Sequence, residues 1–183
     1  MSDIETERQI RYWLLDMDGV LIHEEDPIPG APEFINRLKE LEIPFLVLTN
    51  SSIYSRRDLS ARLHRSGLDV PEKSIWTSAL ATATFLQDQR PNGSAFVVGE
   101  PGLATAMHEA GYTINESDPD YVVLGETRTY SFERITQAIR LILKGARFIA
   151  TNPDNVGPAP GGVLPATGSV AALISRATGV DPY

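Results

Sequence analysis

Apolar and polar positions alternate along the chain in two recurring patterns. Short apolar runs that end in acidic, polar or glycine residues are typical of buried strands, and apolar residues three or four positions apart indicate amphipathic helices. The first pattern predicts strands at residues 12–15, 44–48, 95–98, 121–124 and 147–150. The second predicts helices at residues 31–41, 55–66, 78–89, 102–110, 131–143 and 168–177.

The order of these elements predicts an α/β fold. Short buried strands that alternate with helices form parallel sheets covered on both faces. A turn cluster at residues 91–94 separates the first set of elements from a second set, which predicts a second, smaller α/β domain. Residues 153–165 are rich in Pro and Gly, and we expect them to form no regular element.

The composition narrows the class of protein. The 183 residues allow one or two domains, and 42% hydrophobic with 22% charged residues is typical of a globular protein. Because the sequence has no membrane-length apolar run and no apolar signal-peptide core, we expect a cytoplasmic protein with no membrane partner. The absence of cysteine excludes thiol catalysis and thiolate metal sites. The formal charge of −8 argues against a nucleic-acid partner.

The first candidate chemistry lies directly after the first predicted strand, in Asp16-Met17-Asp18-Gly19. Ligands of open α/β sheets bind at the carboxyl ends of the strands, where Asp16 is expected. Two carboxylates two residues apart can take different roles, one as nucleophile or metal ligand and the other as proton donor and acceptor. Because such a pair would repel a phosphorylated substrate, the motif predicts a Mg²⁺ ion. The alternatives are a polar turn and, less favoured by the position of Gly19, a calcium-binding loop.

A second polar cluster follows the second predicted strand. Thr49, Asn50, Ser51 and Ser52 would lie at the same sheet edge as Asp16, where hydroxyl and amide groups can hydrogen-bond phosphate oxygens. The alternative is that one of these serines caps the helix expected from residue 55.

These residues resemble a known family. Residues 14–21, LLDMDGVL, and residues 46–52, LVLTNSS, resemble the first two motifs of the haloacid dehalogenase (HAD) superfamily. Together with later matches they resemble its NagD-like, 4-nitrophenylphosphatase type, over about residues 11–183. The later matches are at residues 76–79, 97–100, 125–127, 150–154 and 167–169.

The resemblance implies a role for each residue at the site. Asp16 would be the nucleophile that takes the phosphoryl group, and Asp18 would be the general acid and then the general base. Mg²⁺ would be held by the Asp16 carboxylate and the Asp18 main-chain carbonyl. Thr49 would bind the phosphoryl group, with Asn50 and Ser51 helping to position it. In the cap, Asn152 and Asp154 would lie near the substrate.

The resemblance also implies an architecture and a substrate class. Residues 1–91 would be the N-terminal part of a Rossmann-like HAD core, residues 92–181 an inserted α/β cap, and residues 182–183 the start of the return to the core. The activity would be Mg²⁺-dependent hydrolysis of a small phosphorylated metabolite, such as a nucleotide, a sugar phosphate, pyridoxal phosphate or 4-nitrophenyl phosphate. A homo-oligomer formed through the cap is a further hypothesis.

The chain departs from the family pattern at the third and fourth motifs. These are a lysine in a Gly-Lys-Pro setting and a Gly-Asp followed by another acid, and neither occurs in the sequence. We therefore interpret the chain as the first half of the core with a nearly whole cap, a piece of a longer hydrolase. The alternative function is a catalytically incomplete module that binds phosphate and metal without turnover.

Overall fold

The computed structural model describes residues 10–159 and 161–183. Two compact units are present, the first made of the chain up to Thr49 with Ser60–Ile75, and the second of Asn50–Leu59 with Trp76–Tyr183. The predicted α/β fold class with parallel sheets is confirmed. The predicted core at residues 1–91 and cap at residues 92–181 stay predictions.

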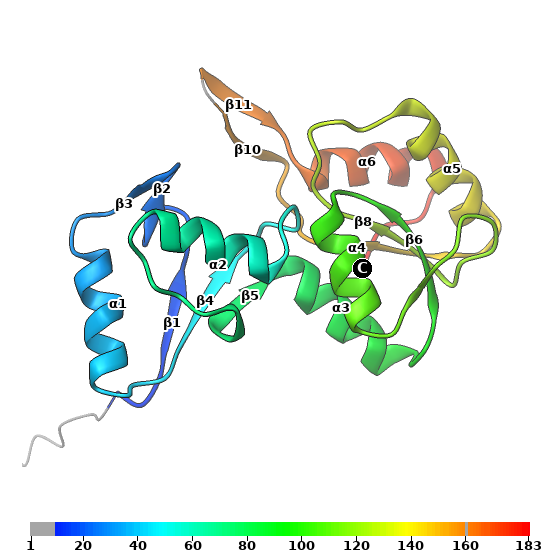
Figure 1. The fold of residues 1–183 in the computed structure, drawn as a ribbon. Coiled ribbons are helices and arrows are strands. Elements are labelled where there is room, and N and C mark those ends of the chain that lie inside the picture. Colours follow the sequence, from blue (N-terminus) through cyan, green and yellow to red (C-terminus); the bar gives the residue numbers. More distant parts are fainter. Residues whose placement is uncertain (1–9, 160) are drawn as a thin grey trace, which may run out of the picture. The chain divides into compact units, whose positions relative to one another are not determined.

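The first unit contains a small parallel sheet. β1 (Trp13–Asp16) and β4 (Phe45–Thr49) pair in parallel and lie side by side, with Asp16 opposite Leu48 (Figure 1). β5 (Ile75–Thr77) is third in the order β1-β4-β5 and leaves this unit after Ile75. The remaining elements up to this point are β2 (Ile22–His23), β3 (Asp26–Pro27), α1 (Ala31–Glu40), α2 (Arg56–Arg65) and the 3₁₀ turn η1 (Glu72–Ser74).

The two faces of the first sheet differ in burial. On one face Leu15 and Val47 are buried, and the Trp13 ring meets Phe34 of α1 edge-on with the ring centroids 5.1 Å apart. Because successive side chains of a strand point to opposite faces, Leu14 and Tyr12 lie on the other face. Their side chains are 68% and 72% exposed. One side of β1 is therefore apolar and uncovered.

The second unit is built on a larger parallel sheet in the order β7-β6-β8-β9. No helix of the described residues is long and apolar enough to cross a membrane. The strands are β6 (Ser94–Val98), β7 (Thr113–Ile114), β8 (Tyr121–Leu124) and β9 (Arg147–Ala150), and the helices are α3 (Ser78–Gln89), α4 (Pro101–Glu109), α5 (Phe132–Leu143) and α6 (Thr167–Thr178).

Both faces of this second sheet are covered. α3 and α4 lie on one side of β6 and β8, and α5 and α6 lie on the other (Figure 1). Alternate residues of each strand supply the two cores: Val97 and Val123 pack toward α3 and α4, whereas Phe96 and Val122 pack toward α5 and α6. The unbroken apolar runs at residues 95–98 and 121–124 are thus explained by burial on both faces.

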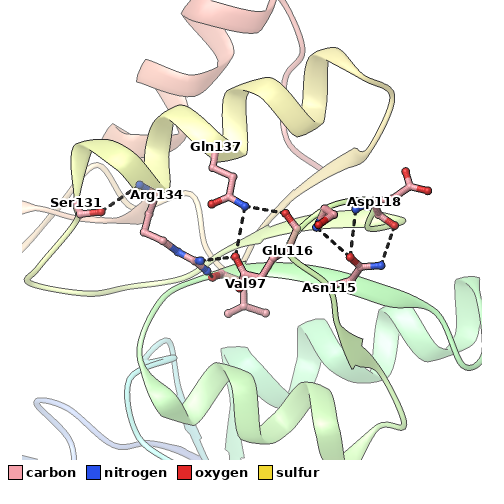
Figure 2. Close-up of polar contacts among 8 residues, drawn as sticks. Val97, Asn115, Glu116, Asp118, Ser131, Arg134 and Gln137 are labelled. Carbon is pink, nitrogen blue, oxygen red and sulfur yellow. Dashed lines mark hydrogen bonds and ion pairs between the residues drawn. The ribbon is translucent and has the colours of Figure 1, made fainter.

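A polar clamp ties α5 to the loop that follows β7 (Figure 2). The guanidinium group of Arg134 donates to Glu116 Oε2 at 2.6 Å and to the carbonyl oxygen of Val97 at 2.5 Å. It also lies 4.1 Å from the ring centroid of Phe96. Gln137 Nε2 adds a hydrogen bond to the Glu116 carbonyl oxygen at 2.7 Å. The clamp holds the short edge strand β7 and its loop against the rest of the sheet.

The expectation that residues 153–165 are irregular is wrong. β10 (Val156–Ala159) and β11 (Gly162–Pro165) form an antiparallel pair. Pro is tolerated here because each strand of a two-stranded ribbon has an open edge, where no backbone N–H donor is needed. The φ angles of Gly161 and Gly162, 82° and 152°, allow the tight reversal between the strands.

The last residues extend the edge of the second sheet. Tyr183 donates its backbone N–H to Phe148 at 3.0 Å, and its carbonyl oxygen accepts from Ala150 at 3.2 Å. The Tyr183 ring stacks on Phe85 of α3, with the centroids 4.8 Å apart. After α6 the chain therefore returns to β9, and Tyr183 pairs with that strand.

Candidate functional site

The two carboxylates of the first motif project from the same side of the chain. Asp16 is the last residue of β1. Asp16 and Asp18 are both exposed, whereas Met17 between them is only 1% exposed. The Met17 N–H donates to Leu48 of β4 at 3.0 Å and to Asp16 Oδ1 at 2.9 Å. The buried methionine therefore anchors the segment and leaves the acidic groups on either side of it at the carboxyl end of the sheet.

A tight turn follows Asp18. Gly19 has φ +81°, in the left-handed region, and its N–H donates to Ile22 at 2.7 Å. The Met17 carbonyl oxygen accepts from both Leu21 and Ile22. Since a Cβ on Gly19 would meet no atom within 4 Å, the need for glycine comes from the backbone angle alone. The turn fixes Asp18 next to the end of β1.

The surroundings of Asp18 change its acidity. Although the residue as a whole is exposed, partial loss of hydration at its carboxyl group is the largest effect and raises the pKa of Asp18, and the nearby Asp16 carboxylate raises it further. The Arg62 charge and the Thr49 hydroxyl act in the opposite direction but do not cancel the rise. Thr49 Oγ1 lies 3.5 Å from Asp18 Oδ2, a long hydrogen bond. The structure thus brings Asp16, Asp18 and Thr49 together, as the sequence predicted.

The donor groups at this edge fit a magnesium ion. Mg²⁺ is usually bound by one or two carboxylates, waters and substrate phosphate oxygens. Asp16 supplies a carboxylate at this edge, and its repulsion with the neighbouring Asp18 carboxylate is the kind that a cation offsets. Among the described residues no group of three or more His, Asp or Glu side chains could hold a metal ion. A site here would draw its remaining ligands from oxygens of other kinds.

Asn50 is fixed by residues far along the chain in the second unit. Its carbonyl oxygen accepts from Ser78 Oγ at 2.7 Å and from Asn152 Nδ2 at 3.3 Å. Its own amide Nδ2 donates to Asp154 Oδ2 at 3.3 Å. The structure therefore brings Asn50, Asn152 and Asp154 together, which are three of the residues predicted for the site.

The loop that carries Asn152 and Asp154 is held tightly. Asn152 is 9% exposed, and its Oδ1 accepts the Asp154 backbone N–H at 3.1 Å. The Asp154 carbonyl oxygen accepts from Gly168 at the start of α6, at 2.8 Å. A Cβ on Gly168 would lie 2.3 Å from the Pro153 carbonyl oxygen, so the loop and α6 are in direct backbone contact.

Ser51 and Ser55 have local roles. Ser51 Oγ accepts the Ile53 backbone N–H at 3.3 Å. Ser55 and Asp58 bond reciprocally, each side chain accepting the other's backbone N–H, as in a capping box at the start of α2. The cap of this helix is therefore Ser55 and not Ser51 or Ser52.

Sequence reasoning missed the groups that pack around this loop. Ser52 is completely buried and Gly102 and Gly125 approach residues 52–54 at contact distance. Nearby, Thr127 donates its hydroxyl to Glu100, which precedes α4. Gly125 and Thr127 stand in a stretch that matched the family, but nothing in their spacing indicated a contact with Ser52.

Comparison with known proteins gives the family. A model of haloacid dehalogenase-like hydrolases matches residues 13–113. The chain belongs to this family. The HAD assignment made from the motifs, including its NagD-like type, is confirmed.

Several proteins named as phosphatases are similar to this chain over nearly all of its length. A dihydroxyacetone phosphatase of Corynebacterium glutamicum is 63% identical over 93% of this chain and 62% of its own length. The ribonucleotide monophosphatase NagD of Escherichia coli is 40% identical over 95% of this chain and 68% of its own length. The crystal structure of a 4-nitrophenylphosphatase from Thermotoga maritima superposes with a TM-score of 0.89 at 36% identity, covering 94% of this chain and 66% of that one.

Proposed function

We propose that this HAD hydrolase is a phosphatase that removes the phosphoryl group from a small phosphorylated metabolite. The observation that carries the proposal is the placement of Asp16 and Asp18 at the carboxyl end of β1, beside Thr49 at the end of the adjacent parallel strand β4. This is the edge at which α/β sheets bind ligands. The names of three similar proteins, a dihydroxyacetone phosphatase, a ribonucleotide monophosphatase and an acid sugar phosphatase, point the same way.

The proposed reaction uses the two carboxylates in sequence. An oxygen of Asp16 bonds to phosphorus while the bond from phosphorus to the substrate oxygen breaks, and Asp18 gives its proton to that oxygen. Asp18 then takes a proton from water, the water oxygen bonds to phosphorus, and the bond to Asp16 breaks. The sum is phosphate monoester plus water giving alcohol plus inorganic phosphate, with both carboxylates restored.

Other residues position the phosphoryl group. Thr49 would hydrogen-bond its oxygens, with Asn50 and Ser51 orienting it. The Asp16 carboxylate and the Asp18 main-chain carbonyl would hold Mg²⁺, which would neutralise charge on the phosphate and on the carboxylates. In this proposal residues 1–91 form part of the core, and residues 92–181 form a cap in which Asn152 and Asp154 lie near the substrate.

The substrate class follows from the relatives' names. The 63% identical relative is a dihydroxyacetone phosphatase, and others are acid sugar phosphatases. We therefore favour a small sugar phosphate, with nucleotides as the next class because of NagD. A homo-oligomer formed through residues 92–181 stays a prediction, and light scattering of the purified chain tests it.

The test is Mg²⁺-dependent hydrolysis of 4-nitrophenyl phosphate and dihydroxyacetone phosphate. We expect Asp16→Asn to lower kcat by about 10⁴-fold or more, as for loss of a catalytic nucleophile. Asp26→Asn, which changes an exposed carboxylate of β3, is the matched control and should leave kcat unchanged. Beryllium fluoride should inhibit the unsubstituted protein. Full activity in Asp16→Asn would refute the proposal.

One alternative has a specific observation in its favour. The sequence contains no Gly-Lys-Pro and no Gly-Asp pair, so a module that binds phosphate and metal without turnover is the second candidate. Titration calorimetry separates the two: phosphate and Mg²⁺ binding without hydrolysis would support the module.

A further inference from the structure

Residues 50–54 follow β4 directly and belong to no helix or strand. A segment without a backbone ladder takes its shape from other hydrogen bonds and from close packing. The segment belongs to the second compact unit, and its anchors lie there. It includes Asn50 and Ser51, which the proposed function places at the phosphoryl group.

Ser52 is the completely buried residue of this segment. Its Oγ accepts the Glu126 backbone N–H at 2.8 Å and lies 3.5 Å from the Thr151 hydroxyl, which donates to it. Glu126 follows β8 and Thr151 follows β9, the neighbouring strand. One hydroxyl therefore joins the segment to the carboxyl ends of two adjacent strands.

Two glycines allow the segment to dock this closely. A Cβ on Gly125 would lie 2.9 Å from Ser52 Oγ. A Cβ on Gly102 would lie 2.5 Å from the Ile53 carbonyl oxygen, which accepts the Gly102 N–H at 3.0 Å. A side chain at either glycine would therefore push the segment away from the sheet, and the hydrogen bonds hold the segment in place.

We propose that Ser52 is a positioning residue for the phosphate-binding loop. Its buried hydroxyl fixes residues 50–54 on the second sheet and so sets the positions of Asn50 and Ser51, two residues and one residue before it. The inference rests on the proposed function. A displacement of about 1 Å in a group that positions a substrate can cost about 10²-fold in rate, so a residue that touches no substrate can still control turnover.

The experiment compares Ser52→Ala with Ser94→Ala in the full chain. Ser94 is the matched control because its hydroxyl also makes a hydrogen bond, to Asp120 at 2.9 Å, but at the amino end of the same sheet. The measurements are kcat and KM for 4-nitrophenyl phosphate with Mg²⁺, and the inhibition constants of orthovanadate and inorganic phosphate. Inhibition constants do not depend on how much of a variant is folded, so a purely structural defect leaves them unchanged.

We expect Ser52→Ala to lower kcat/KM by about 10- to 100-fold. The vanadate inhibition constant should rise more than the phosphate inhibition constant, because vanadate adopts the five-coordinate geometry of the transition state. Ser94→Ala should leave both constants unchanged. Unchanged constants in a folded Ser52→Ala would overturn the inference while leaving the proposed function intact.

Two further measurements apply if Ser52→Ala does not fold or if the unsubstituted protein shows no activity. If Ser52→Ala does not fold, hydrogen exchange of the unsubstituted protein replaces it: the Glu126 amide should exchange more slowly with beryllium fluoride bound, and equal rates would overturn the inference. If the unsubstituted protein hydrolyses no monoester, the proposed function fails, and calorimetry with inorganic phosphate decides. Weaker binding by Ser52→Ala would then support the positioning role, and equal or absent binding would overturn it.

Discussion

The two sheets of this protein contain strands with nearly the same pattern of residues but different burial. β1 and the residue before it read Tyr-Trp-Leu-Leu-Asp, and β8 with the residue after it reads Tyr-Val-Val-Leu-Gly. All four residues of β8 are at most 2% exposed, whereas Leu14 in β1 is 68% exposed. An apolar run therefore predicts a strand, but what packs on each face is decided by the neighbouring elements.

The difference extends to the edges where the strands end. β1 ends in Asp16 and leads to Asp18, carboxylates that stay exposed, whereas β8 is followed by Gly125, which is in contact with Leu103 and Ser52. The two proposed catalytic carboxylates thus follow the less covered sheet, whereas Asn50 and Ser51 belong to the segment that the better packed sheet holds. Rigid support for reactive groups is what a catalytic site requires.

The largest expected effect tests the difference in burial with one substitution in each sheet. Leu124→Ala in β8 should cost about 2–5 kcal/mol in free energy of unfolding, because it leaves a cavity between the sheet and α5. Leu14→Ala in β1 should stay within about 0.5 kcal/mol, since the side chain is exposed. Urea denaturation followed by circular dichroism measures both.

Either half of this comparison can fail. A cost of more than about 2 kcal/mol for Leu14→Ala would mean that the apolar face of β1 is covered in solution. Repeating the measurement at several protein concentrations separates self-association from a face covered within one molecule, because only association depends on concentration.

One glycine in each unit can be compared by what an added Cβ atom would contact. Gly168→Ala should destabilise by about 1–3 kcal/mol, although alanine favours helices, because its Cβ would lie 2.3 Å from the Pro153 carbonyl oxygen. Gly30→Ala in the first unit meets no atom, and its cost of about 1 kcal/mol comes from φ +90° alone. Thermal unfolding of both variants checks the order. Gly30→Asn should recover part of the loss, since asparagine tolerates the left-handed region, whereas Gly168→Asn should recover none.

Charged contacts provide a third comparison. Arg134→Met should cost about 1–2 kcal/mol, because the guanidinium group bonds Glu116 and the Val97 carbonyl and stacks on Phe96. Arg37→Met should cost at most about 0.5 kcal/mol, since its ion pair with Glu40 is exposed on both sides. The measurement is the free energy of unfolding in urea. Equal costs would show that the clamp in Figure 2 is no stronger than a surface ion pair.

Much of the fold could be predicted from the sequence. The strands with four or more apolar residues and the helices were placed within one or two residues, because periodicity reports burial directly. The ribbon β10–β11 was missed because its prolines and glycines suggest a loop, and its pairing needs no buried face. β7 and the pair β2–β3 are two residues per strand, too short to show a period.

The site was predictable where its groups are adjacent in sequence. Asp16 and Asp18 are brought to Thr49 because the ends of neighbouring parallel strands meet. The contact of Asn50 with Asp154 spans 104 positions, and only the family pattern suggested that both residues serve one site. Ser52 was part of the polar cluster predicted for this edge, but nothing indicated its burial, because a serine buried by distant glycines looks in sequence like any loop serine.

The smallest expected effect concerns acid stability, again with one carboxylate in each unit. Burial tends to raise the pKa of Asp120, but hydrogen bonds from the Ser94 backbone and hydroxyl and the charge of Arg90 outweigh it and lower the pKa. The pKa of Asp69 is lowered by its hydrogen bond to Lys39 and by the charge of that lysine. Both folded-state pKa values therefore lie below the ordinary 3.8.

Because the folded protein then holds protons less tightly than the unfolded chain, each carboxylate contributes stability above about pH 4 that is lost as the pH falls through the folded pKa. Asp120→Asn should remove up to about 0.5 kcal/mol of this pH-dependent stability, measured as the difference in unfolding free energy between pH 6 and pH 3. Asp69→Asn should remove less, because the Asp69 side chain is 58% exposed against 23% for Asp120 and is screened more by water. Adding salt should shrink the Asp69 effect further and change the Asp120 effect little. The reverse order would mean that hydrogen bonds from Ser94 contribute less to the folded state than an exposed ion pair does.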